Sequence, residues 1–205
     1  MDKSRFPVNT TTMRLVRPRM DIYYPVVHDY NINPYVAQRV NTTIANKVHE
    51  MNVKQGFYEN PQTEVSGFYE IKNNQRSILS ISLGNYAYSG GAHGLTLMDS
   101  LTFNMQTGQK YELKDLFKKG SNYVQVLSDI IKKQIEQRDI SLFEEFTGIK
   151  RNQEFYIADK SLVIYFQLYE LTAYAYGIPY FPISIYEIED IIDEEGPLGM
   201  MFGSF

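Results

Sequence analysis

The sequence predicts an α+β fold with two small subdomains, in which a helix covers each antiparallel sheet. Three observations lead to this prediction. Runs of alternating apolar residues occur near both ends of the chain and at its centre, and two stretches, 33–56 and 121–138, show helical periodicity. The elements follow the order strands, helix, strands, helices, strands, which is not the strict β–α alternation that a parallel sheet requires.

The composition narrows the classes of function. The chain has 205 residues, 43% of them hydrophobic and 21% charged, as is ordinary for a globular protein. The net charge of -4 provides no basic surface, so we expect no nucleic-acid partner. The absence of cysteine excludes disulfides, cysteine-bound metal and a thiol nucleophile. We expect no cofactor. We also expect no metal site, because His28, His49 and His93 lie in different predicted elements and show no metal-ligand spacing.

The first 56 residues contain two predicted strand segments and a helix. Residues 10–27 are rich in β-formers, and we expect a kink near Arg17. Pro25 indicates an edge position or a strand end, because proline cannot donate to a sheet. The helix begins with Asn33 as N-cap and Pro34 as its first residue, and Gly56 ends it. Its apolar stripe consists of Val36, Val40, Ile44, Val48 and Met51.

A strand over residues 64–71 and the polar turn 72–76 come next. We place the boundary between the two subdomains at this turn. The hairpin that follows has one apolar run at 79–83 and a second at 95–103.

The second half of the chain contains one predicted long helix and three strands. Ser121 is the predicted cap of the helix, whose stripe is Val124, Leu127, Ile131 and Ile135. A short helical piece is expected over 141–146. The expected strands are 155–158, 162–168 and 180–186, the last at a sheet edge because prolines flank its start.

The last residues divide into an acidic run and an apolar tail. Residues 187–195 are strongly acidic and are expected to form a solvated face that begins with a helical turn. The resulting domain limits are 1–75 for the N-terminal subdomain, 76–195 for the C-terminal subdomain and 196–205 for a Gly-rich apolar tail.

The most distinctive stretch is Tyr86-Ala87-Tyr88-Ser89-Gly90-Gly91-Ala92-His93-Gly94, between the two strands of the central hairpin. Its glycines permit positive φ and close backbone approach. His93 is a candidate acid, base or ligand, and the alternative is that its ring bonds the hairpin backbone and fixes the turn. A cell-wall glycan hydrolase would use His93 and a carboxylate. Asp99 and Glu170 are candidates for the paired acids that glycosidases need, and the alternative is that both carboxylates are solvated or hydrogen-bonded.

Known catalytic patterns are missing from the sequence. It contains no H-E-x-x-H, no G-x-S-x-G and no Walker loop.

Tyrosine combines a large rigid ring with a polar end and suits protein or sugar recognition, although sheet packing is the alternative role. The candidate binding residues are Tyr86, Tyr88, His93, Tyr169, Tyr174 and Tyr176.

Residues 86–94 resemble the signature of the extracytoplasmic domain of the RsiV-like family, which comprises lysozyme-sensing anti-sigma factors. The segments 107–108, 113–117, 155–157, 162–166 and 169–177 are also similar to that family. Thr172-Ala173 stands where the family leads us to expect Ala-Pro.

The first third of the chain is similar to the PdaC-like non-catalytic domain, through residues 22–25 and the helix that starts at Asn33-Pro34. The two resemblances together imply two α+β subdomains, of which the second resembles a piece of the Hsp70 ATPase fold.

The resemblance implies a non-enzymatic binding or sensing domain of the bacterial cell envelope. The implied partner is lysozyme, another basic protein or a cell-wall glycan. The alternatives are the glycan hydrolase and a leaderless intracellular protein of the same fold.

Residues 1–7 have no leader-like apolar region, and no run reaches the roughly 18 apolar residues of a membrane span. We expect an extracytoplasmic or envelope location with the leader or anchor absent from this chain, or else a cytoplasmic one.

Overall fold

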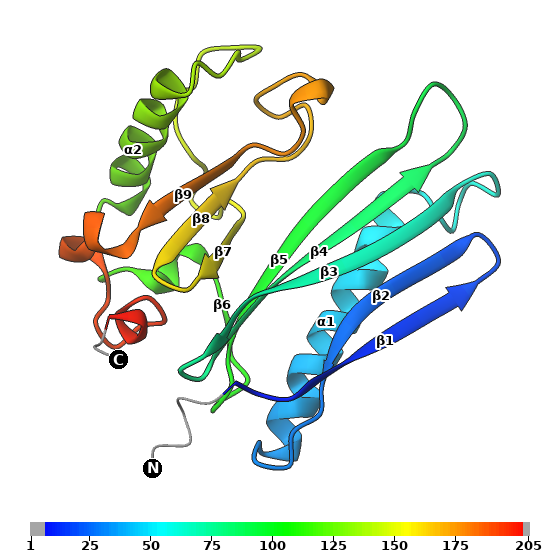
Figure 1. Cartoon of the computed structure of the whole chain (residues 1–205), viewed down its shortest axis with the longest axis horizontal. Helices are drawn as coiled ribbons and strands as arrows, with labels where there is room; N and C mark the ends of the chain where they lie inside the picture. Colours follow the sequence, from blue (N-terminus) through cyan, green and yellow to red (C-terminus); the bar gives the residue numbers. More distant parts are fainter. Residues whose placement is uncertain (1–6, 203–205) are drawn as a thin grey trace. The chain divides into compact units, whose positions relative to one another are not determined.

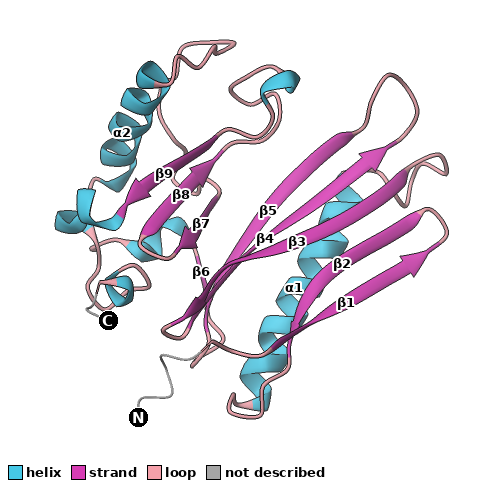
Figure 2. Ribbon diagram, viewed as in Figure 1, coloured by secondary structure: helices cyan, strands magenta, loops and turns pink. Residues whose placement is uncertain are grey.

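A computed structural model of the chain describes residues 7–202. It confirms the α+β prediction, with two α-helices and two sheets in the described part of the chain (Figure 2). The chain divides after Lys110 into two units, each with its own sheet and its own helix (Figure 1).

The first unit is built on a six-stranded sheet with the strands in sequence order. Neighbouring strands are antiparallel in the β1–β2, β3–β4 and β4–β5 pairs, and β2–β3 is parallel. The strands are β1 (Thr10–Arg17), β2 (Met20–Val27), β3 (Glu64–Gln75), β4 (Ile78–Tyr88), β5 (Leu95–Asn104) and β6 (Lys110–Tyr111).

Helix α1 (Pro34–Lys54) supplies the long connection that the parallel β2–β3 pair requires. Its predicted limits are confirmed: the Asn33 side chain accepts a hydrogen bond from the Tyr35 backbone, and Gly56 lies just beyond the end. The predicted stripe is buried, and it packs with the sheet residues that form the core of this unit. Apolar periodicity and capping therefore suffice to define this element.

Of the two positions expected for Pro25, the edge strand is wrong, because β2 lies between β1 and β3, but Pro25 does lie near the C-terminal end of β2. The β2–β3 pairing ends at Ile22, however, so Pro25 lies beyond it. The Asn41 side chain of α1 bonds both the backbone N–H and the C=O of Val27 near the end of β2. Proline is tolerated here because β3 no longer pairs at this level.

Two expected irregularities are hairpin turns. The predicted kink near Arg17 is the β1–β2 turn, where Arg19 has a φ of 67°. Strand β3 extends to Gln75, and the turn to β4 consists of Arg76 and Ser77, both with positive φ as in tight two-residue hairpins. The predicted boundary after residue 75 thus falls inside a continuous sheet, and the first unit continues to Lys110.

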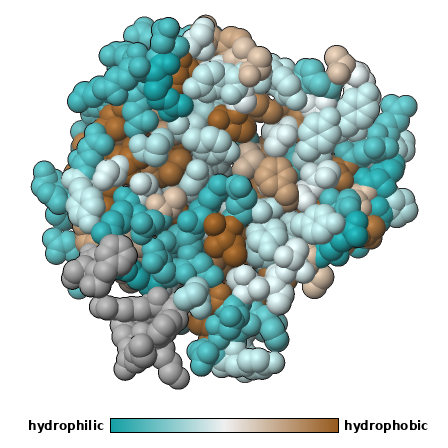
Figure 3. All heavy atoms as spheres, in the orientation of Figure 1, coloured by the Kyte–Doolittle hydropathy of each residue, from teal (hydrophilic) through white to brown (hydrophobic). Residues whose placement is uncertain are grey.

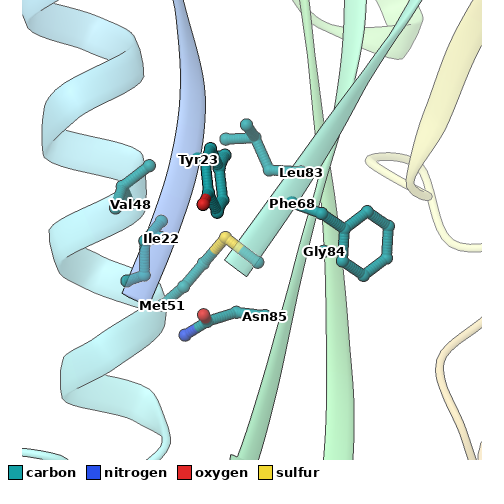
Figure 4. A pocket seen from close by; sticks show the side chains of 8 residues that line it. All are labelled: Ile22, Tyr23, Val48, Met51, Phe68, Leu83, Gly84 and Asn85. Carbon is teal, nitrogen blue, oxygen red and sulfur yellow. The ribbon is translucent and has the colours of Figure 1, made fainter. Parts of the chain in front are cut away.

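The two faces of this sheet differ around Gly84. Figure 4 shows Val48 and Met51 directed from α1 toward the sheet, whereas the Phe68 ring lies against Gly84. A Cβ atom on residue 84 would overlap that ring, which explains the glycine. The void among these residues measures about 10 Å³, enough for no more than a water molecule.

The second unit has a three-stranded antiparallel sheet in the order β7-β8-β9. Its strands are β7 (Phe155–Ala158), β8 (Ser161–Tyr165) and β9 (Tyr180–Ser184), and the predicted edge position of β9 is confirmed. The expected strands at 162–168 and 180–186 are shorter at their C-terminal ends than predicted.

Helix α2 (Tyr123–Gln137) buries Leu127, Ile131 and Ile135 as predicted, whereas Val124, the first residue of the predicted stripe, is only half-buried. Ser121 is not its cap, because Asn122 occupies that position and makes no side-chain capping bond. Residues 141–146 form no helix, although Phe146 is buried. Within residues 7–202, no helix is both long and apolar enough to span a membrane.

Short 3-10 helices complete the second unit: η2 (Leu113–Leu116), η3 (Tyr174–Tyr176), η4 (Ile185–Glu187), η5 (Glu189–Ile191) and η6 (Gly199–Met201). Ile188 and Ile192 are buried inside the acidic run, and Ile192 bridges to Phe117. Leu198 and Met201 are also buried, so residues 196–202 pack as part of this unit and are not a separate tail. Residues 203–205 lie outside the described part of the chain.

Candidate functional site

The Gly-rich loop, residues 89–94, joins β4 to β5 and is bound by its own flanking tyrosines. The Tyr88 hydroxyl donates to the Gly91 carbonyl at 2.9 Å, and the Gly94 N–H donates to the Tyr86 hydroxyl at 3.1 Å. Gly90 and Gly91 have φ values of 90° and 105°, which favour glycine. The two tyrosines therefore fix the conformation of this loop.

His93 contributes to the same backbone network, since its Nδ1 atom hydrogen-bonds the Gly94 carbonyl at 2.9 Å. The two carboxylates of the hydrolase alternative are engaged elsewhere. Asp99 accepts from Lys47 at 3.2 Å, and Glu170 accepts from Lys150 at 2.7 Å. These contacts use both carboxylates as ion-pair partners.

A cluster of side-chain amides supports the base of the Gly-rich loop. The Gln55 amide donates to the carbonyls of Asn85 and Leu95 at 2.8 and 3.0 Å, and the Asn85 amide donates to Asn52 and Gln55. This links the end of α1 to both strands of the hairpin. Sequence reasoning missed the cluster, because isolated amides carry no periodic signal that would pair residues 30 positions apart.

The tyrosine segment, residues 169–177, belongs to the second unit. The Tyr169 and Tyr174 rings are 5.7 Å apart with a 31° interplanar angle. Arg138, just after α2, donates to the Tyr176 hydroxyl at 3.2 Å and to the Tyr180 carbonyl at 2.7 Å. The segment is therefore attached to the end of α2 and to β9.

Beside this segment the second unit contains a cavity of about 570 Å³, which we call the 143–171 groove. Its volume lies within the range of ligand pockets, roughly 300–1,000 Å³. It is lined by Phe143, Glu144, Glu145, Phe146, Thr147, Gly148, Lys150, Gln153, Phe166, Tyr169, Glu170 and Leu171.

Packing and hydrogen bonds hold the groove in shape. The Phe146 and Phe166 rings meet edge to face at 6.0 Å, and the Phe143 N–H donates to the Leu171 carbonyl at 3.0 Å. The buried Gln153 side chain donates to the Tyr165 carbonyl at 2.9 Å. The hydrogen bond to Glu170 holds the pKa of the Lys150 ammonium above its ordinary value.

The predicted site residues thus occupy two surfaces. Tyr86, Tyr88 and His93 belong to the Gly-rich loop of the first unit or flank it, and Tyr169, Tyr174 and Tyr176 belong to the tyrosine segment of the second. Tyr169 is the predicted residue that lines the groove, and the groove itself was not predicted. Among residues 7–202 no group of three His, Asp or Glu side chains is placed to hold a metal ion.

Two family models match separate parts of the chain. Residues 17–96 match the family described as "Deacetylase PdaC", and residues 114–186 match a "Protein of unknown function (DUF3298)". The chain is also similar to the peptidoglycan-N-acetylmuramic acid deacetylase PdaC of Bacillus subtilis (strain 168), with 25% identity over 141 residues. That match covers 65% of this chain and 30% of the deacetylase, so the chain spans about a third of that relative's length.

Two solved structures share the fold. A DUF3298 family protein from Pseudomonas aeruginosa PAO1 superposes with a TM-score of 0.74 at 12% identity, covering 98% of this chain and 100% of that one. A DUF3298 family member from Bacteroides fragilis NCTC 9343 gives 0.64 at 14% identity, covering 96% and 98%. At these identities the likeness concerns the fold alone.

Proposed function

We propose that this chain is a non-enzymatic binding or sensing domain of the bacterial cell envelope, located outside the cytoplasm, with lysozyme or another basic protein as its partner. The observation that carries the proposal is the tyrosine segment, in which Tyr169 and Tyr176 are 48% and 43% exposed. Arg138 bonds the Tyr176 hydroxyl, and the Tyr169 ring packs at a tilt on Tyr174, so both rings are held in place. Exposed rings on a fixed backbone are effective anchors for a protein ligand.

The charge distribution supports a basic partner. The chain has a net charge of -4, and Glu187, Glu189, Asp190, Glu194 and Glu195 are exposed in the acidic run. The buried side chains of Ile188 and Ile192 anchor this run, so its carboxylates remain in solvent. Opposite charges accelerate association with a basic protein, and salt weakens the effect.

A cell-wall glycan is the second candidate ligand. The similarity of residues 17–96 to the deacetylase family, and the name of the B. subtilis relative, connect this part of the chain with proteins of peptidoglycan. Aromatic rings and side-chain amides are also suited to sugar recognition.

Calorimetry of the full chain with lysozyme, at low and at moderate salt, tests the proposal. We expect Tyr174→Ala or Tyr176→Ala to speed dissociation, whereas Glu194→Gln with Glu195→Gln mainly slows association. Absence of heat and of co-elution at micromolar concentration in low salt would exclude lysozyme. Binding of soluble peptidoglycan fragments instead would favour the glycan.

A further inference from the structure

The 143–171 groove has a defined shape that requires no ligand to form. One wall comes from residues 143–150 and the other from 166–171, and the bond from Phe143 N–H to the Leu171 carbonyl joins them. Phe146 and Phe166 pack together against its interior, and the buried Gln153 is hydrogen-bonded to β8. This cavity of about 570 Å³ has the volume of a ligand pocket and is held in shape by these contacts. The chemistry of its lining residues therefore indicates which class of ligand it fits.

The charges that line the groove favour a cation. Three carboxylates and one ammonium line it, which leaves two negative charges in excess. Lys150 and Glu170 neutralise each other at 2.7 Å. Glu144 and Glu145 are exposed, and within residues 7–202 neither carboxylate forms an ion pair. A concave surface with excess negative charge concentrates positive ligands.

Two exposed aromatic rings of the groove also attract cations. Phe143 is 58% exposed and Tyr169 is 48% exposed at the lining of the groove. The face of an aromatic ring attracts ammonium and guanidinium groups. Tyr169 adopts a φ of 66°, as several turn residues of this chain also do, and its ring lies 5.7 Å from the Tyr174 ring at a tilt of 31°, so a neighbouring ring fixes its position.

From these observations we infer that the groove binds the basic side chain, lysine or arginine, of a polypeptide ligand. The aliphatic stem packs on the phenylalanine rings, and the cationic head lies among Phe143, Tyr169 and the two free carboxylates. A neutral sugar would gain nothing from the excess charge. The inference does not depend on lysozyme being the partner.

Tri-lysine and tri-arginine peptides are the probes, titrated into the full chain and followed by NMR and calorimetry at low salt. We expect binding that weakens at least about tenfold when the lysines are Nε-acetylated, because the cation is then lost. Phe143→Ala should weaken tri-lysine binding by about three- to tenfold. The amide signals of residues 143–150 should shift on binding.

Two matched double variants distinguish the effect of the groove carboxylates on tri-lysine binding from the effect of the overall negative charge of the protein. Glu144→Gln with Glu145→Gln removes two charges at the groove, and Glu194→Gln with Glu195→Gln removes two from the acidic run. We expect the first pair to weaken tri-lysine binding at least about threefold and the second less than about twofold. The five side chains changed in these variants, four glutamates and Phe143, are exposed, so thermal unfolding should confirm that each variant folds.

Three results would overturn the inference: equal binding of acetylated and free tri-lysine, an equal loss in both glutamine pairs, or N-acetylglucosamine oligomers that bind in competition with tri-lysine and more tightly. Because lysozyme is absent from these titrations, their failure is distinct from failure of the proposed function. Tyr176→Ala, which targets the proposed lysozyme surface outside the groove lining, should leave tri-lysine binding unchanged.

Discussion

The Gly-rich loop of the first unit and the 143–171 groove of the second both carry exposed rings, but they use them differently. Tyr86 and Tyr88, at 39% and 37% exposure, direct their hydroxyls to the backbone of their own loop. Phe143 and Tyr169 are more exposed and line a cavity. Rings of the first kind maintain a conformation, whereas rings of the second kind are available to a ligand.

Backbone strain differs between the two regions in the same sense. In the Gly-rich loop, glycines occupy the positions of positive φ, where they avoid the steric cost. At the groove, tyrosine occupies such a position, residue 169. The Gly-rich loop thus reaches its conformation without steric cost, whereas the tyrosine segment beside the groove has a non-glycine residue at positive φ. Figure 3 shows hydrophobic residues in separate groups among hydrophilic ones on the visible face, so exposure alone does not identify a site.

The largest effect is expected from disrupting the core of the first unit, on whose sheet the Gly-rich loop is carried. Ile44 is fully buried in α1, and Ile44→Asp places an unpaired charge in the core, which should lower the free energy of unfolding by about 3–5 kcal/mol. Urea denaturation measures this, with Ala45→Asp on the exposed side of α1 as the control. Unchanged stability would show that α1 is not part of this core.

Gly94→Ala tests the close packing of the loop itself. A Cβ atom at residue 94 would overlap the Tyr86 ring and the Ala87 carbonyl, so we expect a loss of about 1–3 kcal/mol in the free energy of unfolding. The control is Gly91→Ala, where a Cβ atom meets nothing and the cost, about 1 kcal/mol, comes from positive φ alone. Equal losses would argue against the role of the Tyr86 contact.

His93→Ala distinguishes a structural from a chemical role. Loss of the bond to the Gly94 carbonyl should lower stability by about 0.5–1.5 kcal/mol, while ligand binding by the folded fraction persists. Thermal unfolding and a wall-hydrolysis assay measure the two quantities. A wall-hydrolysing activity in the unchanged protein that disappears in the variant would instead support the hydrolase.

Tyr169→Gly should produce the opposite pattern. Glycine relieves the positive φ but loses the ring contact with Tyr174, so stability should change by less than about 1 kcal/mol in either direction. Tri-lysine binding should nevertheless fall. A variant that loses several kcal/mol of stability would place Tyr169 with the structural rings of the first unit.

The smallest effect is expected from Asp29 of the first unit, whose carboxyl makes stability depend on acid pH. The Asn9 and Asn31 backbone N–H groups, each bonded to Asp29, hold the pKa of this carboxyl below its usual range. Because the folded pKa is the lower one, this stabilisation is present above about pH 4 and is lost as the pH falls through the folded pKa. Asp29→Asn should make stability less dependent on pH below about 4, as urea titrations at several pH values would show. An unchanged pH profile would contradict this.

Much of the local structure was determined by the sequence alone. The limits of α1 follow from Asn33, Pro34 and five apolar residues at helical spacing, because capping and periodicity act between near neighbours. The central hairpin and the three strands of the second unit follow from alternation and turn residues in the same way. The sequence also singled out Tyr169, which lines the 143–171 groove, and its role in binding stays a prediction.

Only the tertiary structure decided how distant segments combine. The parallel β2–β3 pairing, which makes β2 an inner strand, depends on the path of α1 between the two strands. The packing of Leu198 and Met201 into the second unit depends on space left by residues far away in sequence. The groove exists because residues 143–150 meet 166–171 across a loop, helped by Gln153 and the Phe146–Phe166 contact. Such contacts leave no local periodicity, since their partners are set by chain topology and not by neighbouring residues.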